Sequence, residues 1–300
     1  MRLLRAAPPG RAAVIAFFAQ GGLGNQLFQY AAARSLALRR GTGVVIDPSW
    51  YAPGVEKTTP RTLDLLGLRI EARLAEELHW ERFARLRGRL RSRLPFGRRW
   101  RPRREPRGRF DERLLEAADG SYLIGYWQSW RYFEPIRLGL AVELQPKAPP
   151  GDRDRDLLER IAGTEAIAVH VRRTDYVQVA QASAVHGVCA PDYYVRALSL
   201  LSGEVRRPEV FVFSDDPQWC RAHLAFDVPT TFVDRTGQGG ALDDLRLMAA
   251  CRHFVIANST FSWWGAWLGR HPAKRVVAPA RWYADGRPTP DLLPPGWLLA

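Results

Sequence analysis

Two adjacent arginines, Arg172 and Arg173, are the residues best suited to chemistry in this sequence. They follow the apolar run of residues 166–171, which has the length and composition of a buried strand. Open α/β sheets bind ligands at the carboxyl ends of their strands. A guanidinium group donates two parallel hydrogen bonds and stays charged, so it suits a pyrophosphate. The pair predicts an anion site, and a surface pair neutralised by nearby acids is the alternative.

Two further segments have the character of anion sites. The turn GGLGNQ, residues 21–26, contains Gly24 and Asn25 and lies between an apolar run and a helical stretch. Glycines there let a backbone approach a ligand, and the free N–H groups at a helix start attract anions. The run Asn258, Ser259 and Thr260 precedes a Trp-rich helix and places amide and hydroxyl donors at its start. A tight turn and a helix cap with core aromatics are the respective alternatives.

The glycine turn also supports a second class of protein, an NAD-linked oxidoreductase. Asp47 lies 23 residues after Gly24, near the place of a ribose-binding acid. However, Leu27 stands where the dinucleotide fingerprint has its third glycine, and the turn does not match the phosphate loop either. The oxidoreductase therefore stays as an alternative interpretation.

The acidic pairs favour helix starts over a metal site. In SDDP, residues 214–217, an Asp cap with proline at the first helical position explains the acids without an ion. Ser214 and Asp215 nevertheless end a strand at the ligand-binding edge, so donor contact stays open for them. Three widely spaced cysteines, with no CxxC pair, indicate neither a disulfide framework nor a zinc site. We expect no metal and no other cofactor.

Two α/β series must position these residues. The first runs through a strand at 13–19, a helix at 25–40 and a strand at 44–47. The second comprises a strand from 166, a helix near 192–201, a strand at 210–213, a strand at 254–257, a helix from about 259 and a strand at 275–278. A Pro, Gly and charge-rich stretch at 145–156 is typical of a linker. We expect two domains, at 1–150 and 151–300.

The net charge of +13 is concentrated in one segment. Residues 82–109 contain 13 Arg and one acid, Glu105. A basic nucleic-acid-binding protein is therefore a third interpretation, although the segment lacks a regular aromatic platform for stacked bases. Apolar residues at helical spacing between 80 and 94 suit either a helix lying on an anionic membrane or a helix packed on the first domain. A flexible basic loop is expected from 95 to 109.

No apolar run approaches the roughly 20 residues that span a bilayer, and the first residues lack a signal-peptide cleavage pattern. These features favour a cytoplasmic location, with peripheral contact to the inner membrane through residues 80–109 as an added hypothesis.

Five ordered motifs closely resemble those of the bacterial α-1,2-fucosyltransferases of glycosyltransferase family 11. They are spread over residues 13–285 in the order of that family, which makes the resemblance specific. The motifs are GGLGNQLFQYAAARSLA (21–37), GYWQSWRYFE (125–134), VHVRRTDYV (169–177), VFVFSDDPQWC (210–220) and ANSTFSWWGAWL (257–268).

The resemblance implies a GT-B-like α/β fold, with two Rossmann-like domains facing a central cleft. It implies an inverting, metal-independent transfer of L-fucose from GDP-fucose to the 2-hydroxyl of a galactose in a glycan. The N-terminal domain would take the acceptor and the C-terminal domain GDP-fucose. Nucleic acid is not an expected partner. The donor-binding residues would be Gly24, Asn25, Arg172, Arg173, Ser214, Asp215, Asn258, Ser259 and Thr260.

Such a transfer needs the acceptor hydroxyl to lose its proton as the new bond forms. Asp175 is the candidate base, because it follows the arginines at the cleft edge. His170 is its rival, although a histidine inside a buried strand is more often structural. Arg173 is the third catalytic candidate, because it would stabilise the charge on the departing GDP. Thr174 stands where the family often has glycine, which leaves the choice of acceptor open.

Overall fold

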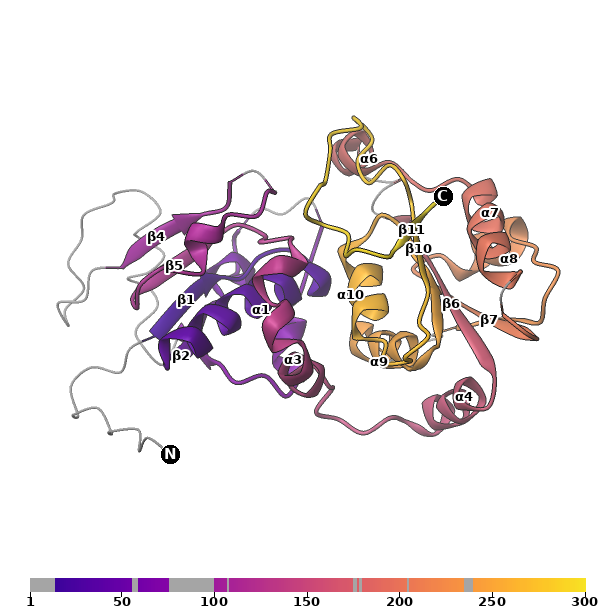
Figure 1. Cartoon of the computed structure of the whole chain (residues 1–300), viewed down its shortest axis with the longest axis horizontal. Coiled ribbons are helices and arrows are strands. Elements are labelled where there is room, and N and C mark those ends of the chain that lie inside the picture. The colour runs from indigo at the N-terminus through magenta and orange to yellow at the C-terminus, as the bar shows by residue number, and fades with distance from the viewer. Residues whose placement is uncertain are drawn as a thin grey trace. The chain divides into compact units, whose positions relative to one another are not determined.

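The computed structural model describes residues 14–55, 59–75, 100–106, 108–174, 177, 180–203, 205–234 and 240–300. The chain forms two compact units, each with its own sheet (Figure 1). The first unit comprises Met1–Gln20, Phe28–Val55 and Glu71–Arg137, and the second comprises Gly21–Leu27, Glu56–Ile70 and Leu138–Ala300. The glycine turn, which the sequence places in the N-terminal domain, therefore has its contacts in the second unit.

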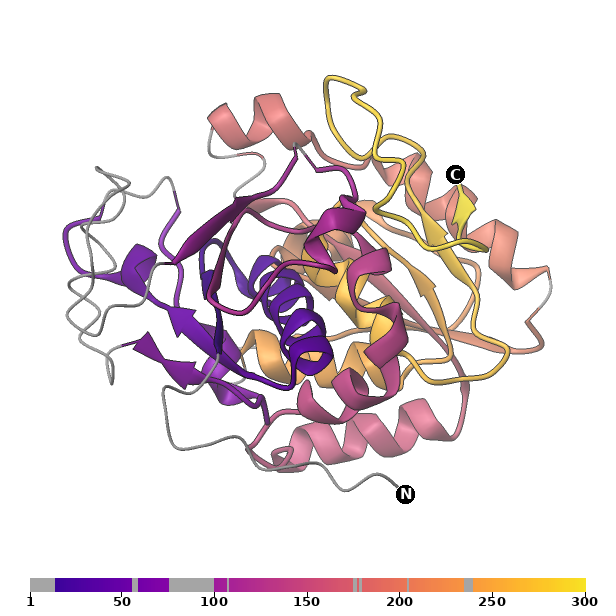
Figure 2. The same cartoon turned by 60° about the vertical axis from the view of Figure 1, so that its left-hand side comes forward.

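The first unit is built on a parallel sheet of five strands in the order β3-β2-β1-β5-β4. Its strand β1 is buried at every residue, as the continuous apolar run predicts. Figure 2 shows the long helix α1 packed alongside these strands. The elements are β1 (Val14–Phe18), α1 (Leu23–Arg40), β2 (Gly43–Asp47), β3 (Arg73–Leu74), β4 (Arg101–Arg104) and β5 (Ser121–Ile124).

The strand order of this sheet reverses between β1 and β5. From β1 the chain proceeds through α1 to β2 and then β3 on one side, whereas β5 and β4 lie on the other side. Ligands of open α/β sheets bind at such a switch point, outside the carboxyl ends of the strands. The segments that leave β1 and β5 therefore occupy the ligand-binding position of this unit.

The Arg-rich segment differs in part from its prediction. Residues 101–104, expected in a flexible loop, form the exposed edge strand β4, which pairs in parallel with β5. Exposed Arg101, Arg103 and Arg104, with Pro102 between them, oppose the addition of a further strand to this edge. Residues 76–99 and 107 lie outside the described part of the chain, so the predicted basic helix is not tested.

The second unit is built on a parallel sheet of six strands in the order β11-β10-β9-β6-β7-β8. Helices α9 and α10 cover one face of it, and α7 and α8 cover the other (Figure 1). The elements are α3 (Arg137–Glu143), α4 (Asp152–Ala162), β6 (Glu165–Val171), α6 (Ala180–His186), α7 (Pro191–Ser202), β7 (Pro208–Ser214), α8 (Pro217–His223), β8 (Thr230–Phe232), α9 (Ala241–Ala250), β9 (His253–Val255), α10 (Thr260–Leu268), β10 (Val276–Ala278) and β11 (Leu298–Leu299).

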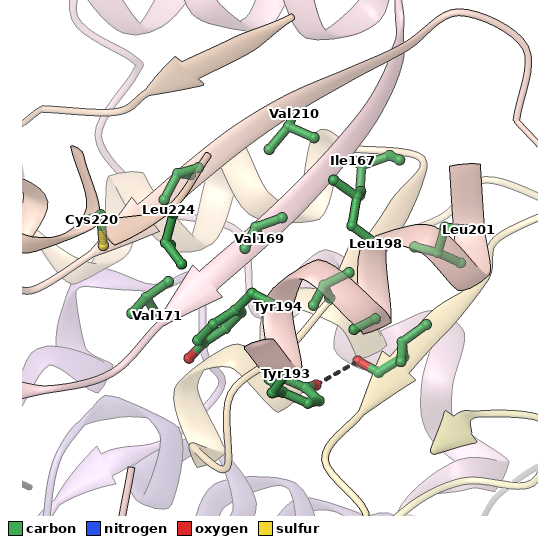
Figure 3. Close-up of a cluster of buried hydrophobic side chains, with 14 residues drawn as sticks. Ile167, Val169, Val171, Tyr193, Tyr194, Leu198, Leu201, Val210, Cys220 and Leu224 are labelled. Carbon is green, nitrogen blue, oxygen red and sulfur yellow. Dashed lines mark hydrogen bonds between the residues drawn. The ribbon is translucent and has the colours of Figure 1, made fainter. Parts of the chain in front are cut away.

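The face of this sheet beneath α7 holds a dry aliphatic and aromatic core (Figure 3). Inward-facing Ile167, Val169 and Val171 of β6 alternate with residues of the opposite face, as the period of a strand requires. The buried Tyr193 hydroxyl donates to the carbonyl of Ile256 at 2.6 Å, which ties α7 to the chain leaving β9.

Two predictions about helices have different outcomes. The linker expected at 145–156 is only partly irregular, because α4 begins at Asp152, where Asp152 and Asp154 favour the first turn of a helix. The core assignment of the tryptophans is confirmed, since Trp263, Trp264 and Trp267 are at most 2% exposed. Within the described residues, no helix is long and apolar enough to cross a membrane.

Candidate active site

The second sheet has its switch point between β6 and β9, and the candidate residues gather there. Strands β6, β7 and β8 follow one another on one side, and β9, β10 and β11 on the other. The segment 172–174 leaves β6 and the segment 256–260 leaves β9, so both reach the same edge. The pairing of Val171 with Ser214 places Arg172 beside Asp215, which follows β7. Two segments 86 residues apart in sequence thus share one ligand-binding edge.

Asp215 braces the segment that carries the two arginines. Its carboxylate accepts hydrogen bonds from the backbone N–H groups of Arg173, at 2.9 Å, and Thr174, at 3.1 Å. The Thr174 hydroxyl donates to the carbonyl of Asp215 at 3.1 Å, and Arg172 Nη1 lies 3.3 Å from its Oδ2. The carboxylate is therefore occupied by the arginine segment, which gives Asp215 a positioning role.

The guanidinium group of Arg173 lies over the face of the Trp219 indole ring. The guanidinium carbon lies 3.8 Å from the ring centroid, and Arg173 Nε lies 3.7 Å from Asp216 Oδ2. His223 stacks on the same indole at 4.6 Å. Arg173 Nε is buried and has no hydrogen-bond partner among the described residues. The two terminal amino groups of Arg173 form a fork of the kind that can bind an anion, and contacts of the guanidinium with Trp219 and Asp216 hold them in place.

The start of α8 has the predicted form. Asp216 is its N-cap and accepts from the Trp219 N–H at 3.1 Å, with Pro217 at the first helical position. The Ser214 hydroxyl accepts from the Asp216 N–H at 2.9 Å. The motif SDDPQW therefore shapes one short turn, whose effect is to place Asp216 and Trp219 against Arg173. The sequence predicted the cap but not the contacts of Asp216 and Trp219 with Arg173.

His170 is buried and neutral. It is 5% exposed, its ring lies 5.4 Å from that of Phe261, and its Nδ1 has no hydrogen-bond partner among the described residues. Burial lowers its pKa to about 3, because a charged imidazole would lose its hydration, and nearby Arg172 adds to the shift while Asp215 opposes it. So weak a base is poorly matched to removing a hydroxyl proton near neutral pH.

The glycine turn packs directly against the start of α10. A Cβ atom added to Gly24 would lie 2.4 Å from the backbone nitrogen of Phe261 and 2.6 Å from Thr260 Oγ1. Only glycine permits this approach. Gly21 has a φ of +81°, and a Cβ there would lie 2.7 Å from Asn25 Nδ2, so the Asn25 amide folds back over the turn. Two of the three predicted anion segments thus meet.

Gln26 and Arg61 lie at the glycine turn but were not identified as candidate site residues from the sequence. The buried Gln26 amide donates to the carbonyls of Gly21, at 3.0 Å, and Thr62, at 2.8 Å, and accepts from the Leu65 N–H at 3.0 Å. It therefore clamps the turn to residues 62–65. A Cβ on Gly22 would lie 3.5 Å from Arg61 Nε, so this clamp also brings a further cation to the turn. Gln26 at the end of the GGLGNQ turn was the available signal.

The start of α10 combines a cap and a buried brace. Ser259 is the N-cap and its hydroxyl accepts from the Phe261 N–H at 3.3 Å. The Asn258 amide donates to the carbonyls of His186, at 2.8 Å, and Trp282, at 3.1 Å, and its Oδ1 lies 3.6 Å from the thiol of Cys189. Asn258 is 3% exposed, so its side chain holds three loops together and is not presented to a ligand.

The structure thus brings together Gly24, Asn25, Arg172, Arg173 and the start of α10. Asp175 lies outside the described residues, directly after Thr174. Among the residues that are described, no group of three or more His, Cys, Asp or Glu side chains is placed to hold a metal ion. Absence of an essential metal stays a prediction about the reaction.

The ribose-binding role considered for Asp47 is wrong. This side chain is 1% exposed, and its oxygens accept hydrogen bonds from the Tyr122 hydroxyl, at 2.5 Å, and the Ser49 N–H, at 2.9 Å. Both carboxylate oxygens are engaged within the first unit. The glycine turn lacks the acid that a dinucleotide site requires.

Comparison with known proteins places these features in a family. Residues 109–299 match the family model described as Glycosyl transferase family 11. The O-antigen biosynthesis glycosyltransferase WbnK of Escherichia coli is 31% identical over 281 residues, which cover 88% of this chain and 93% of that protein. An alpha-1,2-colitosyltransferase of E. coli is 32% identical over 179 residues, covering 58% of this chain and 60% of the relative. The galactoside 2-alpha-L-fucosyltransferase SEC1 of Bos taurus is 27% identical over 270 residues, covering 86% and 65%.

Solved structures agree with the architecture. The fucosyltransferase NodZ from Bradyrhizobium superposes with a TM-score of 0.50 at 16% identity, covering 85% of this chain and 93% of NodZ. Arabidopsis thaliana FUT1, in complex with GDP, superposes with a TM-score of 0.53 at 13% identity, covering 90% and 71%. At these identities the likeness concerns the fold, and the expected GT-B architecture is confirmed.

Proposed function

The chain belongs to glycosyltransferase family 11, and from that premise we propose that it transfers L-fucose from GDP-fucose to the 2-hydroxyl of a galactose residue. Family membership makes it a glycosyltransferase. The observation that carries the choice of donor is the placement of the three predicted anion segments: residues 172–174 and 256–260 leave neighbouring strands at one switch point of the second unit, and the glycine turn packs on the start of α10. The galactoside fucosyltransferase named above supports the choice of acceptor.

The arrangement suits the diphosphate of a nucleotide sugar. Arg173 presents its two terminal amino groups, Arg172 lies beside it, and the N–H groups at the start of α10 contribute a positive helix end. Arg61 adds a cation at the glycine turn. These donors are fixed by Asp215, Trp219 and Gln26 before any ligand binds, so little reorganisation accompanies the reaction.

The reaction then requires one displacement. The 2-hydroxyl oxygen of galactose bonds to C1 of fucose while the bond from C1 to the phosphate oxygen breaks, and the configuration at C1 inverts. The departing GDP gains a negative charge, which Arg172 and Arg173 stabilise. The hydroxyl proton goes to the Asp175 carboxylate in this proposal. His170 is the weaker alternative, since burial holds its pKa near 3.

The proposal includes no essential metal or other cofactor, because fixed cations of the protein lie where a bridging ion would otherwise neutralise the diphosphate. The test is to incubate the full-length protein with GDP-fucose and a β-galactoside, with and without EDTA. We expect equal release of GDP and formation of a fucosyl-α-1,2-galactoside in both samples. Loss of turnover in EDTA would contradict the metal-independent part, and no turnover with GDP-fucose in either sample would contradict the donor.

A colitosyl donor is the second candidate, favoured by the relative that is 32% identical over 179 residues. Colitose is the 3-deoxy analogue of fucose, so one sugar hydroxyl distinguishes the two donors. Competition between the two nucleotide sugars for a limiting galactoside decides between them. A product containing mainly colitose would replace the proposed donor and leave the diphosphate site unchanged.

Peripheral contact with an anionic membrane, through residues 80–109, is the remaining proposal. Its support in the described residues is the exposed cationic strand β4. Flotation with vesicles containing anionic lipid at low salt should recover the protein. Failure to float under those conditions would dismiss this contact.

A further inference from the structure

The loop that leaves β5, residues 125–129, occupies the switch point of the first sheet and is rigidly built. It follows Ile124 at the carboxyl end of β5, next to the end of β1, where the strand order reverses. This is the position at which an α/β sheet binds a ligand. In the second unit the corresponding position is taken by the arginine site. The segment that leaves β5 has no assigned ligand residue.

The backbone of this loop is held in an unfavourable conformation. Trp127 has a φ of +57°, and among the described residues the other non-glycine residue with a positive φ is Arg207, which is exposed in a turn before β7. A bulky residue in the left-handed region costs of order 1 kcal/mol or more, and such strain is found at ligand sites when the surroundings enforce it.

Glu105 holds the backbone on either side of Trp127 and so maintains its left-handed conformation. One carboxylate oxygen accepts from the Tyr126 N–H at 2.8 Å and the other from the Gln128 N–H at 3.2 Å. Gly125 has a φ of +146°, and a Cβ there would lie 2.4 Å from the Cβ of Glu105. The Trp127 ring is 2% exposed and packs edge-on against Tyr132 at 5.7 Å. The loop is therefore fixed on both sides of Trp127.

One consequence of this construction is an exposed aromatic ring at the ligand-binding edge. Turning Trp127 inward leaves its neighbour Tyr126 on the surface, with 40% of its area exposed. The face of an aromatic ring carries partial negative charge and attracts polarised C–H groups. One face of a galactose ring presents three such C–H groups side by side, so an exposed tyrosine at a sheet edge can stack on that sugar.

We propose that Tyr126, held by the Glu105-braced and strained loop 125–129, is the stacking platform for the galactose ring of the acceptor. This inference rests on the proposed function for its choice of sugar. It assigns Tyr126 to binding of the acceptor and Glu105 to positioning, and it gives neither residue a part in binding GDP.

The test compares Tyr126→Ala and Tyr126→Phe with Val195→Ala, a control at a similarly exposed residue of α7. Tyr126→Ala should raise the KM for the β-galactoside about tenfold, while Tyr126→Phe keeps it within about threefold, since the ring face remains. The affinity for GDP and the melting temperature should match those of the control. Glu105→Gln, which retains one acceptor oxygen, should raise the galactoside KM by a smaller factor than Tyr126→Ala does.

Saturation-transfer NMR separates this inference from the proposed function, because it measures binding of the galactoside to the full-length protein, with GDP present and without any transfer reaction. Loss of the galactoside signal in Tyr126→Ala and its retention in Tyr126→Phe would support the platform even if GDP-fucose is not turned over. An unchanged galactoside KM in Tyr126→Ala, or an equal loss of GDP affinity, would overturn it while leaving the transferase activity standing. Failure of the wild-type protein to bind any β-galactoside would overturn it as well.

Discussion

Replacing Trp219 by leucine should weaken the donor site without removing any charge from it. The indole face lies 3.8 Å from the guanidinium carbon of Arg173, whose side chain is 18% exposed. A cation over a tryptophan contributes about 0.5–1 kcal/mol at exposed sites and about 2 when desolvated. For this partly buried pair we take about 1–1.5 kcal/mol, which corresponds to a loss of about five- to tenfold in binding.

The assay is calorimetric titration with GDP, together with kcat/KM for GDP-fucose. Trp219→Phe retains a ring face and should lose at most about threefold, and His223→Ala should have little effect, because it removes the stacking partner on the indole and leaves Arg173 in place. In an Arg173→Ala background, Trp219→Leu should cause no further loss of GDP affinity. A folded Trp219→Leu protein that binds GDP like the wild type, or an equal loss in both backgrounds, would refute the positioning role.

Three further predictions concern residues around the same site. Gly24→Ala should lower GDP affinity at least tenfold, because the new Cβ would lie 2.4 Å from the Phe261 nitrogen; Gly139→Ala, where an added Cβ meets nothing within 4 Å, is the calorimetric control. Asn258→Ala should lower the free energy of unfolding in urea by about 2 kcal/mol, because it removes the donor to the part-buried carbonyl of His186 and the buried carbonyl of Trp282. For His170, the wild type should lose about 2 kcal/mol of stability between pH 7 and pH 5 that His170→Gln does not lose.

The sign of the His170 effect follows from its lowered pKa. The unfolded chain takes up a proton near pH 6.5, whereas the folded protein resists protonation until about pH 3. Acidification through this window therefore favours the unfolded state. Parallel pH profiles for wild type and His170→Gln would contradict a buried neutral histidine. Normal stability of Asn258→Ala with impaired GDP binding would contradict its bracing role, and full activity of Gly24→Ala would contradict the close approach.

Strands β1, β2, β6, β7, β9 and β10 were predictable from the sequence because their signals are local, whereas the short strands β3, β5, β8 and β11 were not among the expected elements. The apolar run at 166–171, the glycine turn and the cap of α8 each involve a few neighbouring residues, and each forms where expected. Strand β4 was missed because its four residues are three arginines and a proline, a composition that indicates a loop. Pairing with β5 supplies the missing stabilisation, and such pairing is not encoded locally.

The candidate residues were predictable by type, whereas their tasks depend on contacts across the chain. Asp215 braces a backbone segment 41 and 42 residues away, and the Asn258 amide reaches His186 and Trp282. Asp215 was a candidate for ligand contact because it ends a strand at the ligand-binding edge, and Asn258 because it precedes the start of a helix. Register between β6 and β7 decides which atoms face one another, and the sequence pattern alone does not specify that register.

The central claim is that Arg172, Arg173 and the start of α10 form a site for the diphosphate of the donor. Calorimetric affinities for GDP, GMP and guanosine, measured on the wild type and on Arg173→Ala, test it most directly. The wild type should bind GDP at least tenfold more tightly than GMP, and Arg173→Ala should remove most of that difference while changing guanosine binding little. Equal affinities of the wild type for GDP and GMP, or an unchanged GDP affinity in Arg173→Ala, would contradict the assignment.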